Sequence, residues 1–268
     1  MFFNGSDSAT ITNSQIIFNG TNKTFLSGNT ATGLLFDTSD ITIDNLDIEM
    51  NAVVSGGTFI ITGINSVTGA SNPTPIKLSN STINVNLTDT NSIAAEADGI
   101  VDTNDIYEIF NSQISTNVNV TNNSGSADAF TRAIDINGST AVLDIQDSQV
   151  SANASATGST TGNSDSAAIR TSFMTAANIE NSQLVSTANA QGTTGAFATS
   201  TGFISNFTPV TVTNSVLDVR SNTSGTTTGS SQAVGMSLNG GSLNQTGNTF
   251  NVVATGTTPT SQTDIIGP

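Results

Sequence analysis

The sequence of 268 residues predicts an all-β fold, a single parallel β-helix (solenoid) of about eight coils. Two observations support this prediction. One short motif recurs about every 33 residues, and apolar residues alternate with polar residues on both sides of it. β-Branched residues, Asn, Ser and Gly dominate the chain, and these residue types have low helix propensity. The chain is therefore expected to consist of short strands and turns.

The recurring motif begins with an asparagine or a similar residue, which is usually followed by two polar residues and one apolar residue. Two copies read Asn80-Ser81-Thr82-Ile83 and Asn111-Ser112-Gln113-Ile114. The first residues of the eight copies are Asn13, Asn45, Asn80, Asn111, Asp147, Asn181, Asn214 and Gly247. Asn, Asp and Gly tolerate a left-handed backbone better than other residues. We therefore expect these eight residues to form a stacked, Asn-rich turn column with positive φ.

Apolar residues flank each of these turn residues at alternate positions. Ile76 and Leu78 precede Asn80, for example, and Ile83 follows it. Alternation with a period of two predicts two strands that each bury one face. A third apolar segment, such as Ala133-Ile134-Asp135-Ile136, precedes each turn residue by roughly ten to fourteen positions. Three strands in the same order in every repeat describe one coil of a parallel β-helix.

One repeat carries a resemblance to a known superfamily. The segments Ala133-Ile134-Asp135-Ile136 and Leu143-Asp144-Ile145-Gln146-Asp147-Ser148-Gln149-Val150 resemble the repeats of right-handed parallel β-helices of the pectin-lyase-like superfamily. The resemblance extends over about residues 9–254 and implies a right-handed helix. It does not imply one activity, because this superfamily includes lyases, hydrolases, phage tailspikes and bacterial surface adhesins. The composition is most similar to adhesin passenger domains of the bacterial autotransporter type.

The organisation of the chain follows from the repeat. No break suggests a second domain, so residues 1–268 are expected to form one β-helix domain. Met1-Phe2-Phe3 is too short for the apolar part of a signal peptide, and no apolar run is long enough to cross a membrane. Because the composition resembles that of exported passenger domains, we expect an extracellular or bacterial cell-surface location. The export signal and the anchor would then lie outside this sequence, which would be a piece of a longer protein.

The charge of the chain is strongly negative. Twenty acidic residues oppose five basic ones, which gives a formal net charge of −15. Nucleic acids and anionic membranes require clustered Lys and Arg, so we expect no nucleic-acid partner and no direct membrane insertion. The sequence contains no Cys and no His. A thiolate metal site and the Ser-His-Asp and Cys-His catalytic arrangements are therefore excluded.

Two groups of acids are candidate metal ligands. The first group is Asp37, Asp40, Asp44, Asp47 and Glu49, and the second is Glu96, Asp98, Asp102, Asp105 and Glu108. Carboxylates are preferred ligands of Ca²⁺, which is the one cofactor that these residues suggest. Their spacing matches neither an EF-hand loop nor the glycine-rich nonapeptide repeat. We interpret both groups as solvated faces and expect no cofactor.

The second group of acids also supports an enzymatic alternative. Hydrolases of the resembling superfamily use grouped aspartates, and Asp98, Asp102 and Asp105 are the candidates for that role. Those enzymes also place His and basic residues nearby, and this chain has no His. In a lyase, Arg132 or Arg170 would be the base beside Ca²⁺, although no motif supports either residue. A polysaccharide lyase or glycoside hydrolase, including the phage tailspike type, is therefore the second interpretation.

Several charged and amide residues occupy equivalent positions in consecutive repeats. These are Lys77 with Glu108, Asp135 with Arg170, and Gln113 with Gln149 and Gln183. Neighbouring coils would hold each set side by side. The two charged pairs are therefore predicted to form ion pairs between coils, and the glutamines are predicted to stack.

The function expected first is a non-enzymatic secreted or cell-surface module that displays loops for adhesion along a rigid rod. Its partner would be a glycan or a surface protein, held by many weak contacts. A passive structural stalk is the third interpretation, because Ser/Thr/Gly-rich loops offer few side chains that dominate interfaces. The chain has no Trp, and its one tyrosine, Tyr107, is expected in the core. The repeat pattern does not place Phe130, Phe173, Phe197, Phe203 and Phe207.

Overall fold

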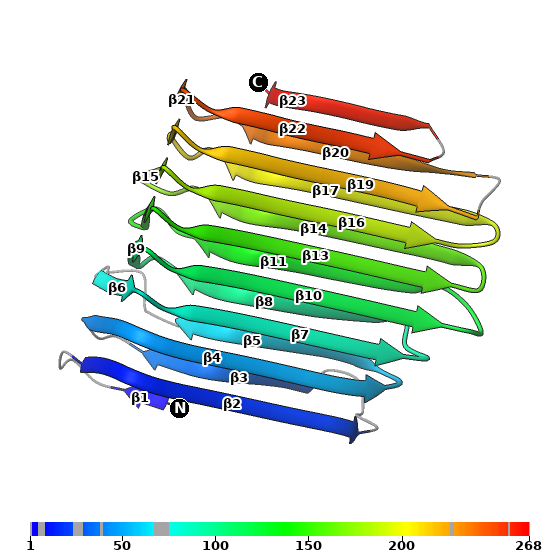
Figure 1. The fold of residues 1–268 in the computed structure, drawn as a ribbon, viewed down its shortest axis with the longest axis horizontal. Helices are drawn as coiled ribbons and strands as arrows, with labels where there is room; N and C mark the ends of the chain where they lie inside the picture. The colour runs from blue at the N-terminus through cyan, green and yellow to red at the C-terminus, as the bar shows by residue number, and fades with distance from the viewer. Residues whose placement is uncertain are drawn as a thin grey trace.

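The chain forms a right-handed parallel β-helix of about seven turns with a period of about 34 residues. The computed structural model describes residues 2–4, 9–23, 29–37, 40–66, 75–225, 228–256 and 258–267. Every element within these ranges is a strand, and the coils stack from the N-terminal to the C-terminal end (Figure 1). The predicted fold class is confirmed. The expected number of about eight coils is slightly too high, because eight turn residues delimit seven full turns.

Two parallel sheets make up the solenoid. The first sheet has nine strands, which follow one another along the solenoid in the order β1-β3-β5-β8-β11-β14-β17-β20-β23. Its strands are β1 (Phe2–Asn4), β3 (Asn29–Asp37), β5 (Thr58–Ser66), β8 (Ala94–Thr103), β11 (Ala127–Asn137), β14 (Thr161–Ser172), β17 (Gly195–Asn206), β20 (Thr228–Asn239) and β23 (Pro259–Gly267). These strands contain the third apolar segment of each repeat.

The second sheet has fourteen strands, because most coils contribute a short strand before the turn residue and a long strand after it. The short strands are β6 (Pro75–Ser79), β9 (Ile106–Phe110), β12 (Val142–Gln146), β15 (Ala176–Glu180), β18 (Val210–Thr213) and β21 (Leu243–Thr246). The long strands are β7 (Thr82–Thr90), β10 (Gln113–Asn122), β13 (Gln149–Gly158), β16 (Gln183–Gln191), β19 (Val216–Ser224) and β22 (Thr249–Thr255). In the first two coils, β2 (Ala9–Lys23) and β4 (Ile41–Ser55) each continue through the turn residue. The residues described in the structure include no helix that could span a membrane.

The core lies between the two sheets and consists of stacked columns of side chains. Ile48, Ile83, Ile114 and Val150 occupy one position in four successive coils, and all four are fully buried. Tyr107 is also fully buried, as predicted. A single coil would expose its apolar side chains above and below, so each coil depends on its neighbours for burial.

The strands of the first sheet bend at a column of small residues. The column contains Gly33, Gly63, Gly99, Gly202 and Gly235, with Ala133 and Ala168 at the same position in two coils. A Cβ atom on Gly99 would lie 2.4 Å from the Ala133 carbonyl oxygen and 2.6 Å from Cγ2 of Ile114. Because Gly99 and Ile100 both face the core, the strand bends there. The preceding outward residue, Asp98, lies in the angle of the bend and is only 6% exposed.

Candidate functional site

The turn residues between the short and long strands all have a left-handed backbone. Their φ angles are 48° at Asn13, 54° at Asn45, 49° at Asn80, 45° at Asn111, 51° at Asp147, 49° at Asn181, 49° at Asn214 and 70° at Gly247. The backbone N–H of each turn residue in the five repeats from Asn80 to Asn214 donates to a carbonyl of the next coil, at 2.9–3.2 Å. The Asn-rich turn column is therefore confirmed as a continuous feature of the fold.

Side chains of the turn column also bond to one another in part of the solenoid. Asn45 Nδ2 donates to Asn13 Oδ1, and Asn111 Nδ2 donates to Asn80 Oδ1, both at 2.7 Å. Asn80 Nδ2 donates instead to Asp44 Oδ1 at 2.7 Å. The bonds from Asn80 and Ser79 lower the pKa of Asp44 below its ordinary value. The amides of this column thus present a row of donors and acceptors along the axis.

A serine follows the turn residue in six of the eight repeats, and the five from Ser81 to Ser215 form a second continuous row. Ser112 Oγ donates to the carbonyl of Phe110 at 2.8 Å and accepts the backbone N–H of Ser81 at 3.1 Å. The same pair of bonds recurs at Ser148, Ser182 and Ser215. We call this row the serine ladder. It satisfies a buried backbone N–H at each turn, which would otherwise carry a desolvation cost.

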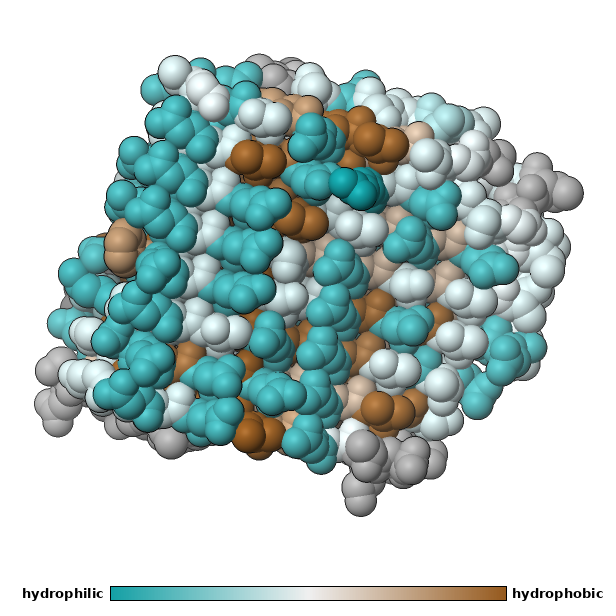
Figure 2. Space-filling model, in the orientation of Figure 1, coloured by the Kyte–Doolittle hydropathy of each residue, from teal (hydrophilic) through white to brown (hydrophobic). Residues whose placement is uncertain are grey.

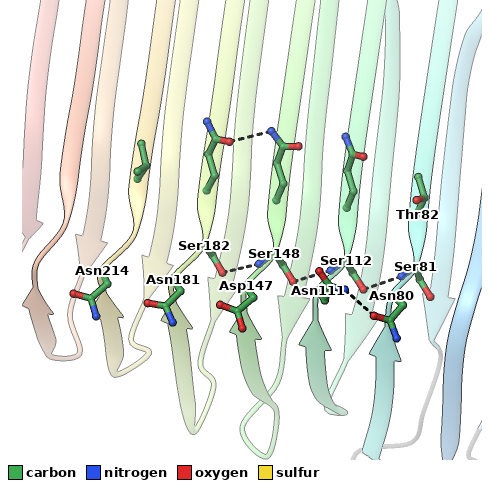
Figure 3. Close-up of a pocket in the computed structure, with 14 residues that line it drawn as sticks. Asn80, Ser81, Thr82, Asn111, Ser112, Asp147, Ser148, Asn181, Ser182 and Asn214 are labelled. Atoms are coloured by element: carbon green, nitrogen blue, oxygen red, sulfur yellow. Dashed lines mark hydrogen bonds between the residues drawn. The ribbon is translucent and has the colours of Figure 1, made fainter.

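A polar groove of about 690 Å³ runs along the axis over the serine ladder (Figure 3). The turn column from Asn80 to Asn214 forms one wall. The residues that follow the serines form the other wall, and they are Thr82, Gln113, Gln149, Gln183 and Val216. The three glutamines are in register, and Gln149 Nε2 donates to Gln183 Oε1 at 3.1 Å, so the predicted glutamine stack is confirmed. The groove therefore offers at least one amide in each of five coils, with a carboxylate at Asp147 and side chains without an amide at Thr82 and Val216.

A further row of asparagines runs along the outer face of the long strands. It contains Asn19, Asn51, Asn86, Asn117 and Asn153, and each Nδ2 donates to Oδ1 of the preceding member at 2.8–3.0 Å. We call this row the amide ladder. Hydrophilic residues form stripes along the axis on this face of the molecule (Figure 2). The repeat places these asparagines six residues after the turn residue, a recurrence that we did not use in the prediction.

The first group of acids does not gather into one site. Asp44 accepts hydrogen bonds from Ser79 and Asn80, Asp47 accepts one from Gln15 and Glu49 accepts one from Asn51, whereas Asp40 is exposed. The side chain of Asp37 lies outside the described part of the structure. Within the described ranges, no group of three or more acids is arranged to hold a metal ion. The partners of these acids are instead amides and hydroxyls of their own and neighbouring coils.

The second group of acids is divided between the core and the surface. Asp102 and Asp105 are buried where β8 meets β9, and the backbone N–H of Asp105 donates to Asp102 Oδ2 at 2.9 Å. Ser66 Oγ donates to Asp105. Burial, together with the charge of Asp105, raises the pKa of Asp102 to about 8. Burial also raises the pKa of Tyr107. These groups have no surface from which to reach a polymer.

Asp98 lies on the outer face of the first sheet, within a network of charged side chains. It is in register with Arg132, whose Nη1 lies 3.0 Å from Glu96 Oε1. Asp98 Oδ1 has no hydrogen-bond partner among the described residues. Burial, and then the charge of Glu96, raise the pKa of Asp98 to about 8. Asp98 therefore shares no surface with Asp102 and Asp105, and the three candidates for hydrolysis do not come together.

Both predicted ion pairs between coils are present. Arg170 Nε donates to Asp135 Oδ1 at 2.8 Å, and Nη2 of the same guanidinium contacts Asp135 Oδ2. Lys77 Nζ lies 2.9 Å from Glu108 Oε2. With Arg132 bound to Glu96, both arginines proposed as a lyase base are occupied by carboxylates. The bonds to Asp135 raise the pKa of Arg170, which opposes a role of Arg170 as a base.

The fold and its polar rows define this protein as a right-handed parallel β-helix with a ladder-lined groove along its axis. Comparisons with models of protein families, with curated proteins and with solved structures found no match. A β-helix serves many unrelated functions, so the function has to be argued from the surface.

Proposed function

We propose that this chain is a non-enzymatic adhesion module that binds an extended glycan along its axis. The observation that supports the proposal is the repetition of the polar groove over five coils. An extended polymer with one hydroxyl-rich unit after another would meet at least one amide at each of the five coils. Single contacts of this kind are weak, and their number along a rigid scaffold would provide the affinity.

A neutral glycan suits this surface better than the other partners considered. The amide side chains of the groove supply both donors and acceptors, which is what sugar hydroxyls require. The net charge of −15 would repel an acidic polysaccharide, so an uncharged one is expected to bind more tightly. A surface protein would need large apolar or arginine anchors at the centre of the contact, and the groove is lined by amides, hydroxyls, the carboxylate of Asp147 and the valine Val216.

The proposed location and family relationship of the chain rest on its fold and composition. We place the module outside the cell or on a bacterial surface, as a single β-helix domain over residues 1–268. The relationship proposed is with passenger domains of the autotransporter type within the pectin-lyase-like superfamily. The right-handed β-helix and the Ser-, Thr-, Asn- and Gly-rich composition support both parts.

A polysaccharide hydrolase or lyase is the second candidate, and one observation favours it. Asp98 lies in the bend of the outer face, and its pKa of about 8 suits a group that donates a proton near neutral pH. A hydrolase also needs a second, ionised carboxylate as base or nucleophile. The neighbouring Glu96 is held by Arg132. This candidate therefore ranks below the adhesion module.

The experiment that tests the proposal measures binding and cleavage together. The purified chain is run through gels that contain neutral polysaccharides (galactomannan, xyloglucan, dextran) or acidic ones (polygalacturonate), with and without Ca²⁺. New reducing ends are measured in parallel. We expect retardation by a neutral polysaccharide without cleavage. Cleavage would transfer the function to the hydrolase or lyase, and the absence of both signals would favour the passive stalk.

Matched variants locate the binding surface within the same experiment. The double variant Gln149→Ala/Gln183→Ala removes two side chains from one wall of the groove. Gln146→Ala is the control, because Gln146 is an exposed glutamine on β12 that does not line the groove. We expect the double variant to weaken retardation several-fold and the control to leave it unchanged. Equal behaviour of the two would exclude the groove as the binding surface.

A further inference from the structure

A second turn column lies at the ends of the first-sheet strands, and two of its members are phenylalanines. The φ angles are 81° at Asn104, 141° at Gly138, 57° at Phe173, 55° at Phe207 and 76° at Gly240. The backbone N–H of each of the first four donates to a carbonyl one coil further on, at 2.7–3.0 Å. The five residues therefore occupy one equivalent position. Asn and Gly suit a left-handed backbone, whereas a bulky aromatic residue there is strained.

The two phenylalanine side chains do not offset this strain by burial. Phe173 is 56% exposed and Phe207 is 52% exposed. Their rings stack, with centroids 5.3 Å apart and planes 13° from parallel. One aromatic contact returns less than two strained residues cost. Stability alone would therefore favour Asn or Gly at both positions, as found elsewhere in the column, and the rings require another explanation.

Side chains of the second turn column lie over the column residue of the next coil. A Cβ atom on Gly240 would lie 2.6 Å from Cδ1 of Phe207, so that ring lies over the next coil. Phe207 covers one face of Phe173. The preceding member of the column, Gly138, has no side chain, and the side chain of Asn104 lies over it, because a Cβ atom on Gly138 would be 2.0 Å from Oδ1 of Asn104. The column thus presents two half-exposed, stacked rings, with the amide of Asn104 over the neighbouring glycine.

The exposed aromatic surface is bordered by amides and a hydroxyl. The residues immediately before the column members are Asn137, Ser172, Asn206 and Asn239, which are in register on β11, β14, β17 and β20. Asn206 Nδ2 donates to Ser172 Oγ at 3.2 Å. Two other exposed phenylalanines, Phe110 and Phe197, lie at the far ends of β9 and β17. The phenylalanine pair is therefore a small apolar surface within polar surroundings.

We propose that Phe173 and Phe207 form a stacking site for one sugar ring of a neutral glycan. The C–H face of a pyranose is apolar and packs against an aromatic ring, while its hydroxyls can reach flanking amides such as Asn137 and Asn206. The choice of a glycan rests on the proposed function. The choice of Phe173 and Phe207 does not rest on it, because the short strand β15 separates Phe173 from the turn residue Asn181 and the polar groove.

A second copy of this chain fits the surface less well than a sugar. A stable protein interface buries about 1,200–2,000 Å² in total, which far exceeds what two half-exposed rings can supply. Two copies would also bring together net charges of −15 each. The flanking row of amides would have to be desolvated against another surface, whereas sugar hydroxyls can satisfy it. The occupant is therefore assigned as a neutral sugar.

The test uses substitutions that suit the backbone while removing the rings. Phe173→Asn and Phe207→Asn place a residue that tolerates positive φ at each position, so loss of binding cannot be ascribed to a strained fold. Phe110→Asn is the matched control, because it removes an exposed ring from another surface. Affinity is measured for galactomannan, xyloglucan and dextran, with saturation-transfer NMR from the aromatic protons to the sugar protons. We expect each substitution in the pair to lower affinity roughly three- to tenfold, and the control to have no effect.

The outcomes separate this inference from the proposed function. Loss of binding in the phenylalanine variants supports the stacking site whether or not Gln149→Ala/Gln183→Ala also loses binding. Loss only in the glutamine variant would keep the groove and overturn the stacking site. Binding of the double variant Phe173→Asn/Phe207→Asn at wild-type strength would also overturn it. Self-association of the wild-type chain that is lost in the double variant would overturn it too, because the phenylalanine pair would then join copies of this chain. If the wild-type chain binds none of the neutral glycans tested, both proposals are rejected.

Discussion

The backbone N–H of Ser112 donates to Oγ of Ser148, which lies 3.1 Å away in the next coil. The same hydroxyl donates to the carbonyl of Gln146 at 2.8 Å. One side chain thus serves a donor in the neighbouring coil and an acceptor in its own. Because the arrangement repeats along the solenoid, the serine ladder links the turns of adjacent coils through buried bonds that the sheets themselves do not supply.

Replacement of this serine should be costly. In Ser148→Ala, the N–H of Ser112 loses its acceptor in a buried position, so the free energy of unfolding should fall by about 1–3 kcal/mol. Ser151→Ala is the control, because Ser151 lies on the outward side of the same strand β13. It should change stability by less than about 0.5 kcal/mol. Urea titration of the three proteins measures the difference, and an equal loss in both variants would contradict the ladder.

The turn column makes a separate prediction about backbone conformation. Asn181 has a φ of 49° and an exposed side chain, so its contribution is mainly conformational. Asn181→Ala should lower the free energy of unfolding by about 1 kcal/mol, because alanine disfavours the left-handed region. Asn181→Gly should be nearly neutral, since glycine adopts positive φ freely. Thermal unfolding of both variants tests this. A similar loss with glycine would assign the effect to the asparagine side chain.

The phenylalanine pair should respond to substitution in the opposite sense from most exposed apolar residues. Phe173→Asn relieves a backbone strain of about 1–2 kcal/mol and loses a ring contact of about 0.5–1.5 kcal/mol. The free energy of unfolding should therefore stay the same or rise by up to about 1 kcal/mol. Phe173→Ala loses the contact without the relief and should be destabilising. Chemical denaturation compares the two variants, and equal destabilisation by Asn and Ala would show that φ is not strained.

Recurrence at equivalent positions explains how much of the fold the sequence predicted. The turn column, the glutamine stack and the two ion pairs each depend only on one period, and neighbouring coils place such residues side by side. The bend at Gly99 and Ile100 could not be found in this way. With simple alternation, Asp98 and Asp102 would face the same side. Two consecutive inward residues reverse the alternation between them and send one carboxyl outward and the other into the core.

The second turn column was missed for a related reason. At its five positions the sequence reads Asn104, Gly138, Phe173, Phe207 and Gly240. Three of the five are residues that suggest positive φ, but phenylalanine carries no such signal. The left-handed conformation of Phe173 and Phe207 is imposed by the strands on either side. Only the structure could therefore show that they belong to a turn and that their rings are exposed.

The two ion pairs between coils should differ in strength. The guanidinium of Arg170 makes two bonds to Asp135, and the side chains are 38% and 14% exposed. A double-mutant cycle with alanine at both positions should give a coupling energy of about 1 kcal/mol after allowance for solvent screening. Lys77 and Glu108 are about half exposed, and their coupling should be below about 0.5 kcal/mol. At 1 M salt the weaker coupling should vanish while part of the stronger remains. Equal couplings would contradict this order.

Stability should decrease as the pH rises from acidic values. The pKa values of Asp98 and Asp102 are raised from 3.8 to about 8 in the folded chain, mainly by burial. A group whose pKa is higher in the folded state binds its proton more tightly there. Its contribution is therefore complete below about pH 4 and is lost as the pH rises through about 8. The largest slope would be about 1.4 kcal/mol per pH unit for each group.

The variant Asp98→Asn isolates one of these two groups. Asparagine keeps the shape of the protonated carboxyl and has no charge to desolvate, so the decline of stability between pH 5 and pH 9 should become shallower. Glu108→Gln is the control, because it removes an acid whose side chain is 47% exposed. Denaturant unfolding at a series of pH values gives the slopes. A slope that is unchanged in Asp98→Asn would mean that this carboxyl is ionised in the folded chain, with Arg132 as the compensating charge.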